Sequence, residues 1–129
     1  MTRVLVCGGR DYQDHKRVFA ELDQIHAERE ISVVIHGACI QRGMLSGADR
    51  WAEAWAIARE VPYWGFPARW NIDGGGKAGP MRNARMLEKA KPHIVVGFPG
   101  GRGTNGMLRM AREAGVMVID AASQPNVTG

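Results

Sequence analysis

Cysteine is scarce in this sequence, and long hydrophobic runs are missing. The 129 residues include only Cys7 and Cys39, too few for a disulfide framework or for the repeated spacing of a structural zinc site. No segment approaches the roughly 18 apolar residues of a membrane span, and residues 1–8 are too short for the apolar core of a signal peptide. These absences predict a cytoplasmic protein without a membrane partner.

Basic side chains are only in modest excess over acidic ones. Seventeen basic and thirteen acidic side chains give a formal net charge of +4 at pH 7. This balance suits an anionic ligand. The basic residues are spread along the chain rather than clustered, which disfavours nucleic acid as the partner.

Short apolar segments alternate with helical patterns along the chain. Between the segments, apolar side chains recur at helical spacing, as in Val18, Leu22 and Ile25. This alternation predicts a three-layer Rossmann-like α/β domain over residues 1–120, with a five-stranded parallel sheet and helices on both faces. Residues 121–129 are small and polar and are predicted to form a flexible tail. The five apolar segments are residues 4–7, 31–35, 63–66, 93–98 and 116–119.

Several helix ends carry sequence signals. Ser46 to Asp49 is typical of a capping box with aspartate in place of glutamate, and Pro80 lies where a first-turn residue is expected. Thr104 is a candidate cap for the helix after the fourth strand, and Gly115 is expected to end that helix.

Glycines, arginines and small polar residues gather where the strands are predicted to end. Ligands of open parallel sheets bind beyond the carboxyl ends of the strands, so these loops are expected to form one cleft. Glycines let backbone N–H groups approach a ligand, helix N-termini present unpaired donors, and arginines add forked donors, so the cleft suits phosphate or another anion. The predicted ligand-binding residues are Gly8, Gly9, Arg10, Asp11, Gly37, Ser46, Gly47, Asp49, Arg82, Asn83, Pro99, Gly100, Gly101, Arg102, Gly103 and Thr104.

The standard cofactor and metal motifs are incomplete. Residues 101–106 satisfy G-x-G-x-x-G, but they follow the fourth strand rather than the first and lack the expected acidic partner about 20 positions on. There is no P-loop sequence, and His36 and Cys39 have H-x-x-C spacing without a second pair. No cofactor and no metal site are therefore predicted.

Taken together, the motifs resemble a known family. Residues 99–104 are similar to the P-G-G-x-G-T signature of the SLOG superfamily, which includes LOG phosphoribohydrolases and the single-stranded-DNA-binding DprA proteins. Over about residues 3–119, the ordered motifs resemble the small YspA/YpsA-related SLOG proteins. The resemblance implies a Rossmann-like fold, a nucleotide or nucleotide-derived ligand, and a homodimer. The other motifs that carry it are Gly8 to Asp11, His36-Gly37, Gly47 to Arg50 and Gly79 to Met86.

The sequence departs from the LOG pattern at a position important for catalysis. The resemblance to LOG enzymes includes an arginine at the place of Arg82. LOG enzymes, however, carry a glutamate three positions after the threonine of the signature, where this chain has Met107. A thioether cannot exchange a proton as a carboxylate does. Nucleotide binding is therefore the leading hypothesis, and whether the protein is an enzyme stays open.

Two alternatives remain beside nucleotide binding. The first is N-glycosidic hydrolysis of a nucleoside monophosphate, with Arg82 holding the phosphate or ribose and Asp49 or Asp11 as the carboxylate. The second is single-stranded DNA binding, as in DprA. A further departure is the long stretch of residues 38–45, for which a lid, a dimer contact and a reshaped phosphate loop are all possible.

Overall fold

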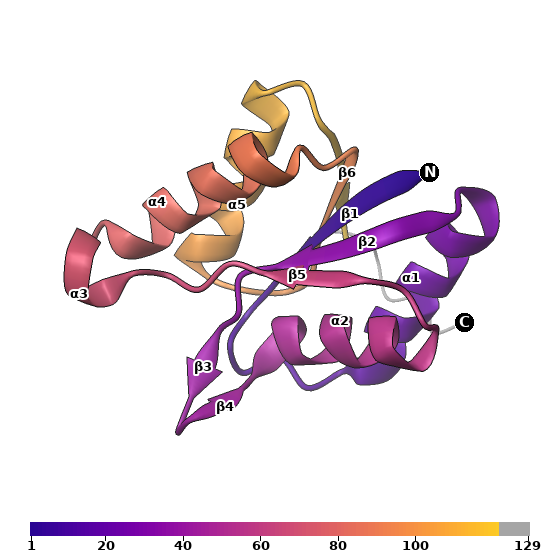
Figure 1. Ribbon diagram of the computed structural model, residues 1–129, viewed down its shortest axis with the longest axis horizontal. Coiled ribbons are helices and arrows are strands. Elements are labelled where there is room, and N and C mark those ends of the chain that lie inside the picture. The colour runs from indigo at the N-terminus through magenta and orange to yellow at the C-terminus, as the bar shows by residue number, and fades with distance from the viewer. Residues whose placement is uncertain (122–129) are drawn as a thin grey trace.

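Five parallel strands form one sheet in the order β5, β2, β1, β6, β7 (Figure 1). The central strand β1 (Thr2–Cys7) pairs with β2 (Ile31–His36) on one side and with β6 (Ile94–Gly97) on the other. The edge strands are β5 (Tyr63–Gly65) and β7 (Met117–Asp120). The five-stranded parallel sheet that the sequence predicts is confirmed. The structure is a computed structural model that describes residues 1–121, so all of the predicted tail beyond residue 121 lies outside the described residues.

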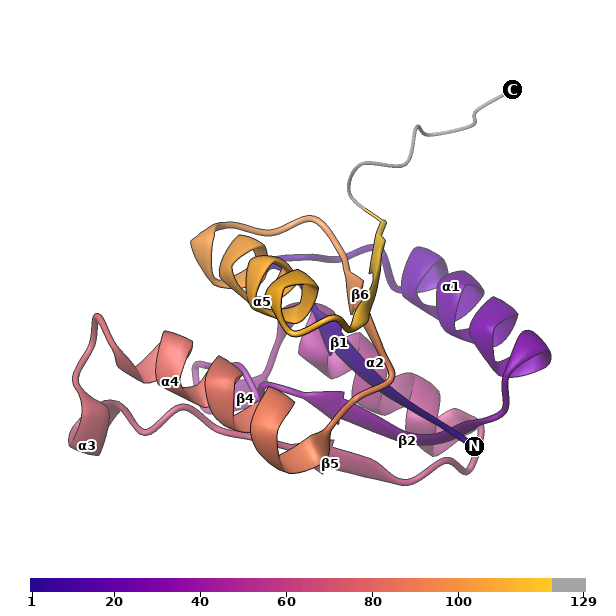
Figure 2. The same ribbon diagram turned by 90° about the horizontal axis from the view of Figure 1, so that it is seen from above.

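Helices cover both faces of the sheet (Figures 1 and 2). Helices α1 (His15–Glu28) and α2 (Gly47–Ala58) lie on one face. On the other face lie α5 (Arg102–Glu113) and α4 (Ala78–Arg85), which continues directly into a π-helical turn, η1 (Met86–Ala90). The predicted Rossmann-like architecture is therefore present. A short helix that the sequence patterns did not predict, α3 (Trp70–Asp73), precedes α4.

The central strand shows why its sequence is apolar throughout. Side chains alternate between the two faces of a strand. Val4 and Val6 are fully buried against α1 and α2, whereas Leu5 and Cys7 belong to the core beneath η1 and α5. With both faces covered, every position of β1 favours an apolar residue.

The two edge strands are less covered than their apolar sequences indicate. Tyr63 and Trp64 of β5 are each 47% exposed, as is Met117 of β7. Each edge strand pairs with only one neighbouring strand, so its side chains are covered less completely than those of β1.

Two of the predicted helix caps are wrong. Ser46 is the N-cap of α2, but its side chain makes no capping hydrogen bond; its hydroxyl lies 3.8 Å from the sulfur of Cys39. Gly101, not Thr104, is the N-cap of α5, and Thr104 lies inside the first turn. Pro80 lies in the first turn of α4, as predicted, and Gly115 ends α5 in the left-handed region with φ +77°.

Residues 38–45 fold into a β-hairpin that the sequence patterns did not predict. Strands β3 (Ile40–Gln41) and β4 (Met44–Leu45) are antiparallel, and Arg42 and Gly43 between them have φ values of +51° and +76°. Two central residues with positive φ define the tight turn that matches the twist of a hairpin.

Among the helices of residues 1–121, none is long and apolar enough to cross a bilayer.

Candidate functional site

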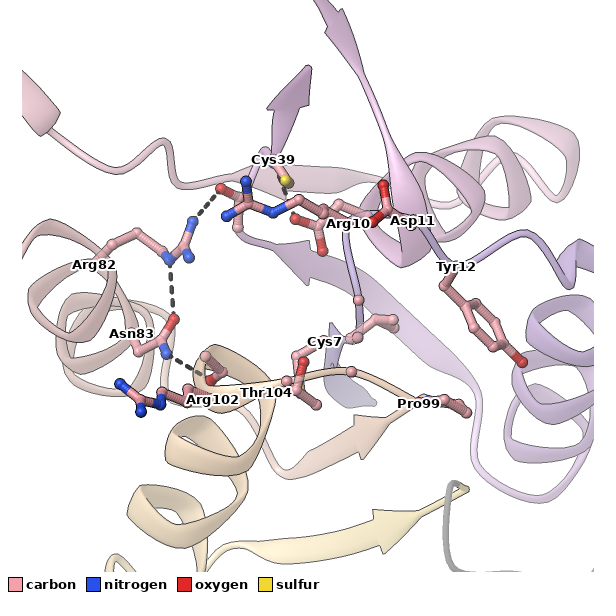
Figure 3. A pocket seen from close by; sticks show the side chains of 18 of the residues that line it. Cys7, Arg10, Asp11, Tyr12, Cys39, Arg82, Asn83, Pro99, Arg102 and Thr104 are labelled. Atoms are coloured by element: carbon pink, nitrogen blue, oxygen red, sulfur yellow. Dashed lines mark hydrogen bonds between the residues drawn. The ribbon is translucent and has the colours of Figure 1, made fainter. Parts of the chain in front are cut away.

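A cavity of about 670 Å³ lies at the carboxyl edge of the sheet, beyond β1 and β6 (Figure 3). Every predicted ligand-binding residue lines it except Ser46 and Gly47. The strand-end loops thus meet at one place, as the sequence predicts. The predicted residues in its wall are Gly8, Gly9, Arg10, Asp11, Gly37, Asp49, Arg82, Asn83, Pro99, Gly100, Gly101, Arg102, Gly103 and Thr104.

Two glycine loops form the floor by direct backbone contact. The amide of Gly9 donates to the carbonyl of Pro99 at 2.8 Å, which joins the loop after β1 to the loop after β6. At Gly100 a Cβ atom would overlap Thr104 Oγ1 and would lie 2.7 Å from the Gly9 nitrogen. Only glycine permits this approach, and the amide of Gly9 is used in joining the loops rather than left free for a ligand.

The first turn of α5 supplies free donors at the rim. Its N-cap, Gly101, has no side chain to accept from the amides of Arg102, Gly103 and Thr104. Among residues 1–121, no backbone or side-chain atom accepts from these three amides. All three residues line the cavity. Unpaired amides at a helix N-terminus carry partial positive charge and bind anions.

Arg82 of α4 is held in a fixed orientation at the opposite wall. Its Nη1 donates to the carbonyl of Gly37 at 2.5 Å and its Nε donates to Asn83 Oδ1 at 2.9 Å (Figure 3). Asn83 in turn donates to the carbonyl of Gly103 at 3.2 Å. This chain of hydrogen bonds connects the loop after β2 to the first turn of α5 through one guanidinium group. Its Nη2 makes no hydrogen bond to the residues that the structure describes.

The surroundings of Arg82 are restrictive. A Cβ atom at Gly37 would lie 2.6 Å from Arg82 Nη1, so a larger residue would displace the guanidinium. Burial lowers the pKa of Arg82 from its ordinary value, and the nearby carboxylate of Asp49 acts in the opposite direction. An arginine stays charged despite such a shift. The cavity therefore contains a partly desolvated, oriented cation.

Asp49 is buried in the same wall and does not cap α2. It is 8% exposed, and its Oδ2 accepts from the amide of Cys39 at 3.0 Å. The predicted capping box is wrong because this carboxylate satisfies the loop after β2 instead of the end of its own helix. Burial raises the pKa of Asp49, while His36, the amide of Cys39 and Arg82 lower it by a smaller amount.

The raised pKa of Asp49 predicts a pH-dependent stability. The folded protein binds the Asp49 proton more tightly than the unfolded chain does, so protonation of Asp49 stabilises the fold. This stabilisation is complete below the pKa of Asp49 in the unfolded chain, near 3.8, and is lost as pH rises through its higher pKa in the folded protein. Compared with Asp49→Asn, the wild type should gain unfolding free energy as pH falls from about 7 to about 4, by at most ~1.4 kcal/mol per pH unit. Urea denaturation of both proteins across this range measures the difference. A difference in unfolding free energy that stays constant or shrinks as pH falls would contradict the raised pKa of Asp49.

Arg10 and Arg102 are less constrained than Arg82. In Figure 3, Arg10 extends over the cavity towards the side of Arg82, whereas Arg102 extends past Asn83. Asp11 accepts from Gln41 Nε2 of the hairpin at 3.4 Å. No ion pair joins Arg10 to Asp11 within the described residues.

Gly47 supports the site from behind and does not line it. Its φ is +66°, and a Cβ atom there would overlap the Gly9 carbonyl and lie 2.7 Å from Arg10 Cα. The amide of Ala48 donates to that Gly9 carbonyl at 3.2 Å. Gly47 therefore lets the loop after β1 pack on the start of α2. Ser46 faces an adjoining cavity beside the hairpin.

The wall also contains residues that the sequence reasoning missed. Cys7 is the last residue of β1, and burial raises the pKa of its thiol to about 12. Its position at the end of a strand is a signal that points to Cys7, as it does to Gly8 and Gly9. The missed lining residues are Val6, Cys7, Tyr12, Cys39 and Met86.

The described residues contain no cluster of metal ligands, and a buried methionine stands at the position of the LOG glutamate. No group of three or more His, Cys, Asp or Glu side chains in the described part of the chain could hold a metal ion. Both ring nitrogens of His36 have partners: Nδ1 accepts from the amide of Ala38, and Nε2 lies 3.0 Å from Glu53 Oε1. Met107, where LOG enzymes carry glutamate, is fully buried in the core beneath α5.

Comparison with known proteins identifies one family. A family model described as "YspA, cpYpsA-related SLOG family" matches residues 2–72, more than half of the chain. The match covers the loop after β1, the hairpin and Asp49, and it ends before Arg82 and the loop after β6. No curated protein matches the sequence.

Proposed function

The chain belongs to the YspA, cpYpsA-related SLOG family, a nucleotide-related family, and from this premise we propose that its main cavity binds a nucleotide or nucleotide-derived ligand. The proposal rests on one observation: the fixed guanidinium of Arg82 and the free amides at the start of α5 line the same cavity. These are the two kinds of donor that hold phosphate in proteins. The cavity volume of about 670 Å³ lies within the range of small-molecule sites.

The charge distribution favours an anion with attached hydroxyl groups. Arg10, Arg82 and Arg102 all line the cavity, against the carboxylates of Asp11 and the buried Asp49. The phosphate would lie between Arg82 and the first turn of α5. Asp11, at the outer wall, would accept from the ribose hydroxyls, because a carboxylate bonds only to donors.

Titration calorimetry tests this proposal. We expect at least one compound from a panel of AMP, GMP, ADP, ADP-ribose and cyclic nucleotides to bind with a Kd below about 1 mM, the weak end of specific binding. Binding should compete with inorganic phosphate, because the phosphate contacts are the anchor. A panel in which nothing binds would refute the proposal.

One observation favours hydrolysis as a second candidate function. Asp49 is a buried carboxylate with a raised pKa in a cavity, an arrangement common among general acids and bases. In that case Arg82 would hold the phosphate or ribose of a nucleoside monophosphate while Asp49 assists cleavage of its N-glycosidic bond. Chromatography of AMP and IMP incubated with the protein would show released base. Unchanged turnover in Asp49→Ala would remove Asp49 from the mechanism.

A further inference from the structure

A second cavity, of about 660 Å³, adjoins the first. It lies between the β3–β4 hairpin and the start of α2, and in Figure 1 the hairpin projects beyond the carboxyl edge of the sheet at this place. Asp11 lines both cavities, so the two spaces share this residue. The two cavities have nearly the same volume.

Two hydrogen bonds position the hairpin that lines the second cavity. At its base, the amide of Ser46 donates to the carbonyl of Cys39 at 2.9 Å. Along one face, Gln41 pairs with Met44 and donates to Asp11 at 3.4 Å, which fixes the hairpin to the loop after β1. The second cavity therefore has a defined wall instead of a free loop, so less ordering cost is expected on binding.

Two arginines give the second cavity its charge. Arg42, at the hairpin turn, and Arg50, on α2, both line it, and its one lining carboxylate is Asp11. In the described part of the chain neither arginine forms an ion pair. The guanidinium of Arg50 lies 4.6 Å from the ring centre of Trp51, a cation–π contact that restricts where it can reach.

We propose that the two cavities bind a single ligand made of two nucleotide units joined through phosphate. The inference rests on the function proposed above for the main cavity and names the class of its ligand. One unit would occupy the main cavity against Arg82, and the other would cross Asp11 and place its phosphate between Arg42 and Arg50. Each cavity has the volume of a small-molecule site and is lined by its own arginines, so each can hold one nucleotide unit.

The experiment compares one and two units on matched proteins. Titration calorimetry would use AMP and GMP, the phosphodiester dinucleotides pApA and pGpG, and the pyrophosphate-linked diadenosine diphosphate. The proteins are wild type, the double variant Arg42→Ala/Arg50→Ala, and Arg29→Ala as a control. Arg29 is exposed and directly follows α1, at the opposite edge of the sheet. Thermal unfolding of each variant checks the fold, and single Arg42→Ala replaces the double variant if that one is unfolded.

The inference predicts that at least one dinucleotide binds about tenfold or more tightly than its mononucleotide. The double variant should lose this advantage and keep the mononucleotide Kd, and Arg29→Ala should behave as wild type. Mononucleotide binding without a dinucleotide advantage, or an advantage that survives in the double variant, would overturn this inference and leave the proposed function intact. Absence of binding by every compound would overturn both.

Discussion

Arg82→Ala is expected to weaken nucleotide binding about 100-fold. Within residues 1–121, Arg82 is the one arginine of the cavity whose guanidinium is fixed by two hydrogen bonds, to the Gly37 carbonyl and to Asn83. A charge-assisted hydrogen bond contributes roughly 1.5–3 kcal/mol, so loss of the group that faces the phosphate should cost about one to two orders of magnitude in Kd. Titration calorimetry with the tightest compound of the panel gives this value directly.

Two further variants separate the role of Arg82 from general charge. Arg82→Lys keeps the positive charge but loses the planar fork, so an intermediate loss of about tenfold is expected. Arg29→Ala removes the same charge at the far edge of the sheet and should leave the Kd unchanged. If Arg82→Ala folds normally and binds as tightly as the control, Arg82 does not hold the ligand.

Gly47→Ala is expected to lower the free energy of unfolding by roughly 2–5 kcal/mol. The left-handed backbone at φ +66° costs an alanine roughly 1–2 kcal/mol. A Cβ atom would in addition overlap the Gly9 carbonyl and approach Arg10 Cα to 2.7 Å, which adds an overpacking cost of roughly 1–3 kcal/mol. Urea denaturation monitored by circular dichroism measures the change.

Gly43→Ala is the matched control for this effect. Gly43, in the hairpin turn, also has a positive φ, of +76°, but no atom lies within 4 Å of a Cβ built there. It should therefore lose only the roughly 1–2 kcal/mol of the strained backbone. Equal losses in the two variants would mean that the contact of Gly47 with the loop after β1 does not matter for stability.

The fold was predictable because the parallel sheet leaves a strong local pattern. The run from Val4 to Cys7 is apolar throughout, since β1 is covered on both faces. The position of the cavity followed from a general rule, that parallel strands bring their carboxyl ends to one edge. Most predicted site residues line the cavity for that reason.

Details that depend on tertiary contacts could not be predicted. The spacing of Ser46 and Asp49 fits a capping box, yet Asp49 accepts from Cys39, a contact that sequence spacing does not encode. Strands β3 and β4 have two residues each, too few to show an alternating pattern. Gly47 looked like a ligand-binding glycine because the sequence cannot show that the loop of Gly9 packs against it.

The central claim is that the amides of α5 and the guanidinium of Arg82 together hold a negatively charged group. Nuclear magnetic resonance of ¹⁵N-labelled protein titrated with AMP tests it most directly. We expect the largest shifts at the amides of Arg102, Gly103 and Thr104 and at Arg82 Nε, with Arg29 unaffected. Saturable shifts confined to another surface, with these four signals unmoved, would contradict the account.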